Sequence, residues 1–122
     1  MFVLSVKDVF SAAHKLDNYH GKCEELHGHN FIVEAVFKGE TLSSDGMLVD
    51  FKILKQYLKN VLDMLDHRYI NEIAFFAERA SSSEYIAMFI FNEIKATIKE
   101  KNISLKAIKV WESEKACAAY EE

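Results

Sequence analysis

The chain has 122 residues, of which half are apolar and 12% aromatic, and its formal net charge is −4. This length favours one domain spanning residues 1–122, and the composition fits a packed core and excludes a disordered chain. The 15 basic residues are scattered and form no basic stripe of the kind that binds nucleic acid.

The longest strongly apolar run, at 86–91, is too short to cross a bilayer. The start of the chain, MFVLSVKD, carries charged residues and no cleavage signature of a signal peptide. Without such a signal, Cys23 and Cys117 are expected to be reduced thiols, and a disulfide between them is the alternative. We therefore expect a cytoplasmic protein with no membrane partner.

Two strands are predicted at the start of the chain. Residues 2–14, FVLSVKDVFSAAH, place His14 on an alternating apolar face, because side chains in a strand repeat every second residue. After a polar, irregular stretch, residues 27–38, HGHNFIVEAVFK, alternate cleanly and place His27 and His29 on the apolar face. We expect these two runs to pair as antiparallel strands.

Two helices follow. Apolar residues at helical spacing predict a helix capped by Asp50 and extending through Asp66. The capping-box pattern of Ser81 and Glu84 predicts the start of a second helix, which ends near Asn102.

The end of the chain predicts two more strands, at 105–113 and 116–120. The order is then β-β-α-α-β-β, an α+β domain with an antiparallel sheet. Such a sheet has two open edges, and an exposed edge tends to pair with another chain. We therefore expect an oligomer.

Three histidines form a candidate metal site. Two positions apart in a strand, the imidazoles of His27 and His29 point the same way and lie roughly 7 Å apart. His14, near the end of the neighbouring strand, can add a third imidazole to the same face. Three imidazoles with an open fourth position predict a catalytic zinc site, because a structural site is closed by four protein ligands. The alternative is that these are ordinary half-buried histidines.

Cys23 lies in the polar stretch, four residues before His27. A thiol near a dication or a cationic histidine loses its proton more easily, and it can then act as nucleophile or general base. Its neighbours Lys22 and Glu24 are too polar for a core position, which argues against a buried apolar role. A zinc-dependent hydrolase remains an alternative, because Glu24 or Glu25 can supply the carboxylate base that it needs.

Two further sites contain acids. Asp66 and His67 fall at the predicted end of the first helix, where the carboxylate can orient the imidazole for acid–base work; an ordinary helix end is the alternative. Glu112 shares a strand face with Ile108 and Val110, and an acid on an apolar face needs a partner. A ligand with adjacent N–H and NH2 groups, such as a pterin or guanine, fits that carboxylate, although a surface glutamate at a strand end is more common.

The stretches FSAAH, CEELHGHN, LDHRYIN and SSSE…VWES occur in this order, and together they resemble the family of 6-pyruvoyl-tetrahydropterin and 6-carboxy-tetrahydropterin synthases. The connection SSDGMLVDF (43–51) is similar as well, so the resemblance covers nearly the whole chain. It implies the tunnelling fold, in which three subunits join their sheets into a barrel. Two such trimers stack into a homohexamer with sites between subunits.

The resemblance also implies three groups of site residues. The zinc ligands are His14, His27 and His29. The catalytic groups are Cys23, Asp66 and His67. The pterin-binding residues are Glu112, which anchors the ring, and Ser82 and Ser83, which line its pocket.

The activity that the resemblance implies is that of a zinc-dependent carbon–oxygen lyase acting on 7,8-dihydroneopterin triphosphate. Triphosphate leaves, and the pyruvoyl branch of the family keeps the three-carbon side chain. The carboxy branch also releases acetaldehyde and feeds 7-deazaguanine and queuosine synthesis. The short spacing between Cys23 and His27 is similar to the bacterial carboxy type, so we expect 6-carboxy-5,6,7,8-tetrahydropterin as product. Proximity to the motifs makes Lys15, Lys22 and Arg68 candidate triphosphate contacts.

Glu24, directly after Cys23, keeps another product open. A folate-pathway branch of the family carries a glutamate at this position and releases 6-hydroxymethyl-7,8-dihydropterin, so Glu24 is a candidate alternative acid–base group. From another class, a non-catalytic pterin- or purine-binding protein would keep the pocket. Turnover of dihydroneopterin triphosphate separates the synthases from such a binder and from a hydrolase.

Overall fold

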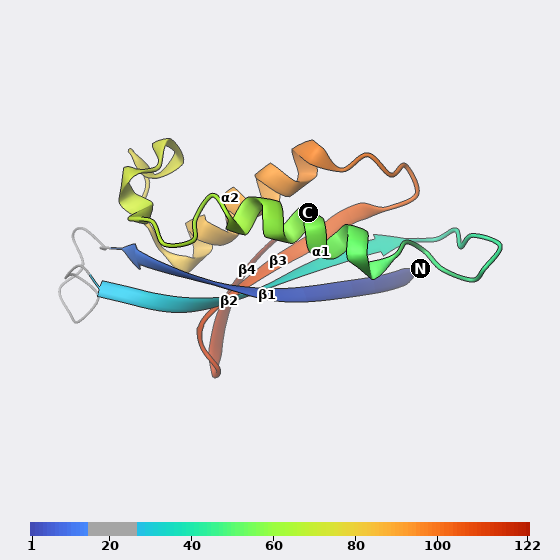
Figure 1. The fold of residues 1–122 in the computed structure, drawn as a ribbon, viewed down its shortest axis with the longest axis horizontal. Coiled ribbons are helices and arrows are strands. Elements are labelled where there is room, and N and C mark those ends of the chain that lie inside the picture. The colour runs from blue at the N-terminus through green and yellow to red at the C-terminus, as the bar shows by residue number, and fades with distance from the viewer. Residues whose placement is uncertain (15–26) are drawn as a thin grey trace.

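The computed structural model describes residues 1–14 and 27–122, without the side chain of His27. Cys23, Glu24 and the candidate triphosphate contacts Lys15 and Lys22 lie outside the described residues. The strands and helices are, in chain order, β1 (Phe2–His14), β2 (His27–Gly39), α1 (Phe51–Leu62), α2 (Ser83–Thr97), β3 (Ser104–Ser113) and β4 (Ala116–Glu121) (Figure 1). The predicted order β-β-α-α-β-β is confirmed.

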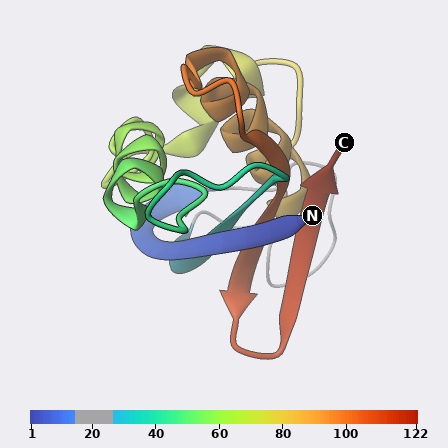
Figure 2. The ribbon, with the colours of Figure 1, turned by 90° about the vertical axis from the view of Figure 1, so that its right-hand side faces the viewer.

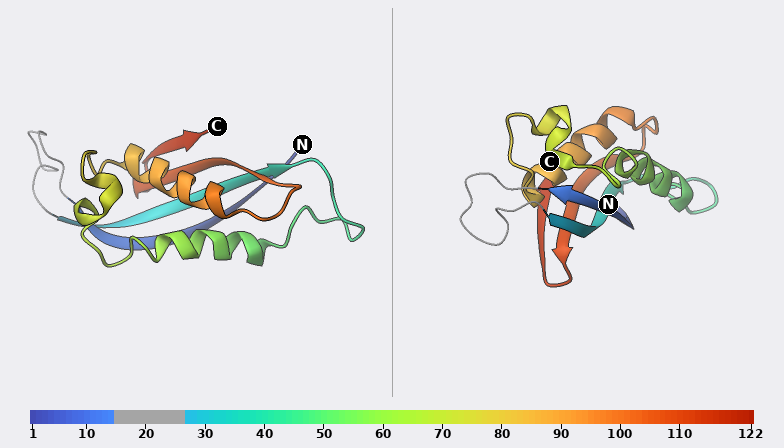
Figure 3. Two further views of the ribbon diagram at one scale, coloured as in Figure 1. Left: turned by 90° about the horizontal axis from the view of Figure 1, so that it is seen from above. Right: turned by 60° about the vertical axis from the view of Figure 1, so that its left-hand side comes forward.

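The four strands form one antiparallel sheet in the order β1-β2-β3-β4. Both helices lie on one face of this sheet, where α1 packs on β1, and α2 on β3 and β4 (Figures 2 and 3). The inward-facing apolar side chains of β2 are fully buried, as the alternation in the sequence predicts. They are Phe31, Val33, Ala35 and Phe37. No helix among the described residues is long and apolar enough to span a membrane.

Helix α1 starts as predicted and ends earlier. The side chain of Asp50 accepts the N–H of Lys52 at 2.8 Å and caps the helix. The helix stops at Leu62 instead of extending through Asp66, because main-chain bonds of the i→i−3 type tighten the chain at 61–65. Asp66 and His67, which were predicted at the end of this helix, therefore lie in a turn.

Helix α2 begins one residue later than predicted. Its N-cap is Ser82, whose hydroxyl accepts a helix N–H at 3.3 Å, so the capping box starting at Ser81 is wrong. The side chain of Ser81 instead hydrogen-bonds Asn71 at 3.0 Å. The helix ends at Thr97 and not near Asn102, because the backbone becomes extended directly afterwards. Between the helices lie two short 3-10 turns that the sequence pattern did not predict, at 70–72 and 74–76.

Candidate active site

The β1–β2 register brings the predicted metal ligands to one end of the sheet. The Cα of His14 lies opposite that of His27, and Ala12 lies opposite His29. Because His14 and His29 are diagonal neighbours on the helix-covered face, their rings come together, with centroids 5.1 Å apart and planes at 71°. The predicted pairing of these histidines across two strands is therefore present.

This separation fits two imidazoles that bind one zinc ion. With Zn–N distances of about 2.0–2.1 Å and a tetrahedral angle, the two ring centroids come to lie roughly 5 Å apart. The side chain of His27, the third predicted ligand, is outside the described part. Among the described side chains alone, no group of three His, Cys, Asp or Glu residues is arranged to hold a metal.

The orientation of His14 is set by the loop before α2. The ring is fully buried, and its Nδ1 lies 2.8 Å from the main-chain oxygen of Ser81. A carbonyl oxygen only accepts hydrogen bonds, so Nδ1 carries a proton, and in the neutral imidazole Nε2 then carries the lone pair. The imidazole is thus in the tautomer that offers Nε2 to a metal.

Asp66 and His67 are fixed to the outer edge of β1. The N–H of Ser11 donates to Oδ1 of Asp66 at 2.9 Å, and the N–H of His67 donates to the carbonyl of Ser11 at 2.6 Å. Further along, the N–H of Ala13 donates to the carbonyl of Arg68 at 3.0 Å. The segment after α1 therefore covers the end of a strand edge that would otherwise be open.

Within this segment the carboxylate orients the imidazole. Oδ2 of Asp66 lies 3.0 Å from Nδ1 of His67, whose side chain is 83% exposed. The Ser11 N–H, and then His67, lower the pKa of Asp66 below its ordinary value, because both stabilise the ionised form. His67 has a φ of 57°, a left-handed conformation that is uncommon outside glycine. The pair therefore lies in a turn held by β1, and not at the end of a helix as predicted.

Glu112 is partnered by the first turn of α2. The hydroxyl of Ser83 donates to Oε1 of Glu112 at 2.7 Å. Both residues line a cavity of about 700 Å³ that also includes His29, Ser82 and Cys117. The predicted ring anchor, the hydroxyl-bearing serines and one predicted metal ligand therefore share one cavity.

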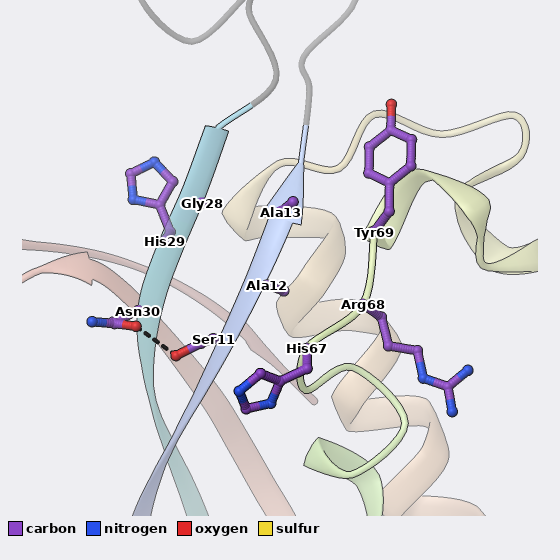
Figure 4. Close-up of a pocket in the computed structure, with 9 residues that line it drawn as sticks. All are labelled: Ser11, Ala12, Ala13, Gly28, His29, Asn30, His67, Arg68 and Tyr69. Atoms are coloured by element: carbon purple, nitrogen blue, oxygen red, sulfur yellow. Dashed lines mark hydrogen bonds between the residues drawn. The ribbon is translucent and has the colours of Figure 1, made fainter.

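A second cavity of about 480 Å³ lies at the ends of β1 and β2. His29, His67 and Arg68 are among its lining residues. Figure 4 shows that His67 lies beside β1, whereas the ring of His29 projects from β2 in the direction away from it. Within one chain, the acid–base pair and the predicted metal ligand thus border the same cavity without pointing toward each other.

Sequence reasoning missed three residues that support this site. The main-chain oxygen of Ser81 contacts the ring of His14, Asn71 accepts the hydroxyl of Ser81, and the main chain of Ser11 binds Asp66. A main-chain acceptor and a buried serine leave no periodic signal. Asn71 does lie in the LDHRYIN stretch, but its spacing from the other residues indicates no role.

Comparisons with known proteins show which family the chain is similar to. The family described as 6-pyruvoyl tetrahydropterin synthase matches residues 3–122. The chain is 32% identical, over 144 aligned residues covering all of both chains, to the 6-carboxy-5,6,7,8-tetrahydropterin synthase of Haemophilus influenzae.

Two other proteins are similar. The dihydroneopterin monophosphate aldolase of Pyrococcus furiosus is 35% identical over 105 residues, which cover 84% of this chain and 82% of that protein. The structure of Caenorhabditis elegans 6-pyruvoyl tetrahydropterin synthase superimposes with a TM-score of 0.88 at 29% identity, covering 99% of this chain and 95% of the other.

Proposed function

The chain belongs to the 6-pyruvoyl tetrahydropterin synthase family, and within it we propose that this enzyme converts 7,8-dihydroneopterin triphosphate into 6-carboxy-5,6,7,8-tetrahydropterin. One water is consumed, and triphosphate and acetaldehyde are released. One side-chain carbon stays on the ring as the carboxylate, and the other two leave as acetaldehyde. The side chain is oxidised as the ring is reduced, so no external oxidant or reductant is needed. The similarity to the Haemophilus influenzae enzyme supports this branch.

The observation that carries the proposal is the shared cavity of Glu112 and His29. A carboxylate that accepts the N–H and NH2 groups of a pterin fixes the ring in one orientation. The side chain of the bound ring then extends along the cavity wall toward the histidines. Ring anchoring and side-chain chemistry are thus performed by different residues.

The residues present fit a zinc ion, and we assign it to His14, His27 and His29. The 5.1 Å separation of the His14 and His29 rings supports this assignment. When bound, zinc supplies a Lewis acid that polarises the side-chain oxygens and acidifies the neighbouring C–H.

Two groups move protons in this proposal. The thiolate of Cys23 removes the carbon-bound proton, because a thiol near a cation is ionised at neutral pH. The imidazole of His67 returns a proton from Nε2, since Asp66 holds its Nδ1.

The acid–base pair is proposed to act on the site of a second copy. His67 is exposed at the β1 edge, and its ring does not face His29 of its own chain. The rest of β1 and the outer edge of β4 have no paired strand among the described residues. Edge pairing between copies would bring His67 of one copy to the cavity of the next, as in the expected trimer barrels and homohexamer.

A second candidate function is cleavage of the side chain to give 6-hydroxymethyl-7,8-dihydropterin. The similarity to the Pyrococcus furiosus aldolase favours it. In that reaction Glu24 would replace Cys23 as the acid–base group. Both functions use the same ring anchor and the same metal ligands, so they differ in the acid–base group and in the fate of the side chain.

Incubation of the zinc-loaded protein with 7,8-dihydroneopterin triphosphate tests the proposal. The expected products are 6-carboxy-tetrahydropterin and acetaldehyde in equal amounts, measured by mass spectrometry and by an aldehyde assay. Hydroxymethyl-dihydropterin with glycolaldehyde triphosphate would support the second function instead. The role in 7-deazaguanine and queuosine synthesis follows only from the first outcome, and this role and a cytoplasmic location stay predictions.

A further inference from the structure

A chain of contacts links the acid–base segment to the buried metal ligand. Asn71 lies in the 3-10 turn after the segment that holds Asp66 and His67. Its Oδ1 accepts the hydroxyl proton of Ser81 at 3.0 Å. The main-chain oxygen of Ser81 in turn lies 2.8 Å from Nδ1 of His14. We propose that Asn71 and Ser81 are positioning residues that fix the ring orientation and tautomer of His14, and through them the zinc affinity.

The main-chain carbonyl of Ser81 contacts the ring of His14 directly. It holds the proton of His14 on Nδ1 and leaves the lone pair on Nε2. If the tautomer changed, the lone pair of Nδ1 would face the carbonyl oxygen of Ser81, and Nε2 would carry a proton and could not bind a metal. Outer contacts of this kind change metal affinity by about 10–100-fold in other proteins.

The position of the Ser81 carbonyl is set by contacts on both sides of the residue. Ser81 lies in a connecting segment without regular hydrogen bonding, yet its side chain is fully buried. On one side the next residue, Ser82, caps α2. On the other side, the hydroxyl of Ser81 is bound by Asn71. The carbonyl is therefore held on both sides, and the contact with Asn71 joins it to another segment.

Asn71 follows a segment that is itself bound to β1. This segment just before Asn71 is attached to β1 because Tyr69 forms a parallel bridge with Ala13, the neighbour of His14. The contacts thus form a closed circuit that leaves β1 at Ala13 and returns to β1 at His14. The turn that carries Asp66 and His67 and the ligand His14 are held by one network.

This inference rests on the proposed zinc site and is tested with two measurements. In the zinc-free protein at pH 8, long-range ¹⁵N–¹H spectra of the imidazoles report the tautomer. We expect a proton on Nδ1 of His14, and a proton on Nε2 would overturn the proposal whether or not zinc binds.

The second measurement is zinc affinity by chelator competition in Ser81→Ala, Asn71→Ala and the double variant. Each single variant is expected to bind zinc about 10–100-fold more weakly, and the double variant no more weakly than the worse single one. Asn71→Asp keeps the acceptor for the Ser81 hydroxyl and should retain most of the affinity. Asn60→Ala, which removes an exposed side-chain hydrogen bond on α1, is the matched control and should bind as the wild type does.

The outcomes separate the two hypotheses. Wild-type protein that binds no zinc contradicts the proposed function, and the tautomer measurement still decides the positioning role. Wild-type protein that binds zinc, together with unchanged affinity in both single variants, overturns the positioning role and leaves the function standing. If Ser81→Ala fails to fold, as judged by circular dichroism, the partly exposed Asn71→Ala and Asn71→Asp pair gives the decision.

Discussion

The hydroxyl of Ser83 donates to Oε1 of Glu112 at 2.7 Å and joins the first turn of α2 to the end of β3. The contact orients a carboxylate that the sequence alone places on an apolar strand face. It leaves the remaining acceptor positions of the carboxylate for a ligand, since a carboxylate accepts up to about four hydrogen bonds.

The orientation of the Glu112 carboxylate predicts graded losses of substrate binding. Ser83→Ala should raise KM at least about 10-fold, because a hydrogen bond to a charged group contributes roughly 1.5–3 kcal/mol and about 1.4 kcal/mol is a factor of ten. Glu112→Gln should raise KM further, since its amide cannot accept both pterin donors. Both variants should keep full zinc content, and Glu114→Gln, in the exposed turn nearby, is the control. Loss of zinc in Glu112→Gln, or normal binding, would refute the anchor role.

The histidine cluster predicts about one zinc ion per chain. His14→Ala, His27→Ala and His29→Ala should each lose most of the metal, because two remaining imidazoles bind zinc far more weakly than three. His67→Ala should keep it, since its imidazole is held by Asp66 at the β1 edge. Metal content is measured by atomic emission after gel filtration. Unchanged zinc in any of the first three variants contradicts the ligand set.

Asp66 should titrate below its ordinary pKa of 3.8 in the folded protein. Folding lowers this pKa, so the ionised carboxylate stabilises the fold above the unfolded-state pKa, and that contribution is lost as pH falls through the folded-state pKa. The Ser11 amide is the largest cause, so the shift should persist in His67→Ala. An NMR titration of the Asp66 carboxyl carbon in both proteins measures this. A return to 3.8 in the variant would show that His67 is the main cause.

The sequence predicted the strands more accurately than the ends of the helices. The predicted bounds of β1 equal the observed ones, and those of β2 differ by one residue. Period-2 alternation is sharp when one face of a strand is buried. Both helices end earlier than predicted, since apolar spacing continues past the last helical hydrogen bond and tertiary contacts decide the ends.

In the candidate site, the residues within strands were predicted from the sequence, whereas their partners from connecting segments were not. His14 and His29 were placed on one face from alternation alone, and Glu112 on the face of Ile108 and Val110. Their partners Ser81 and Asn71 come from connecting segments whose position depends on the packed structure, so no local pattern predicts them. The tunnelling fold and the site roles were predicted from a family resemblance. That resemblance depends on several motifs in one order, because no single motif is specific enough.

Cys23 and Glu24 are expected to differ in what their removal does to the products. Cys23→Ala should abolish formation of 6-carboxy-tetrahydropterin while zinc and pterin still bind, because the thiolate is the better base at neutral pH. Glu24→Ala should keep most of that activity. Product identification in both variants is the measurement. Full carboxypterin synthesis by Cys23→Ala would overturn the assignment of the base.

The most direct test of the proposed reaction is identification of the wild-type products by mass spectrometry after incubation with 7,8-dihydroneopterin triphosphate and zinc. We predict that 6-carboxy-5,6,7,8-tetrahydropterin accumulates with acetaldehyde and triphosphate in equal amounts, and that Glu112→Gln slows this through KM. Unconsumed substrate, or 6-hydroxymethyl-7,8-dihydropterin as the main product, would contradict it.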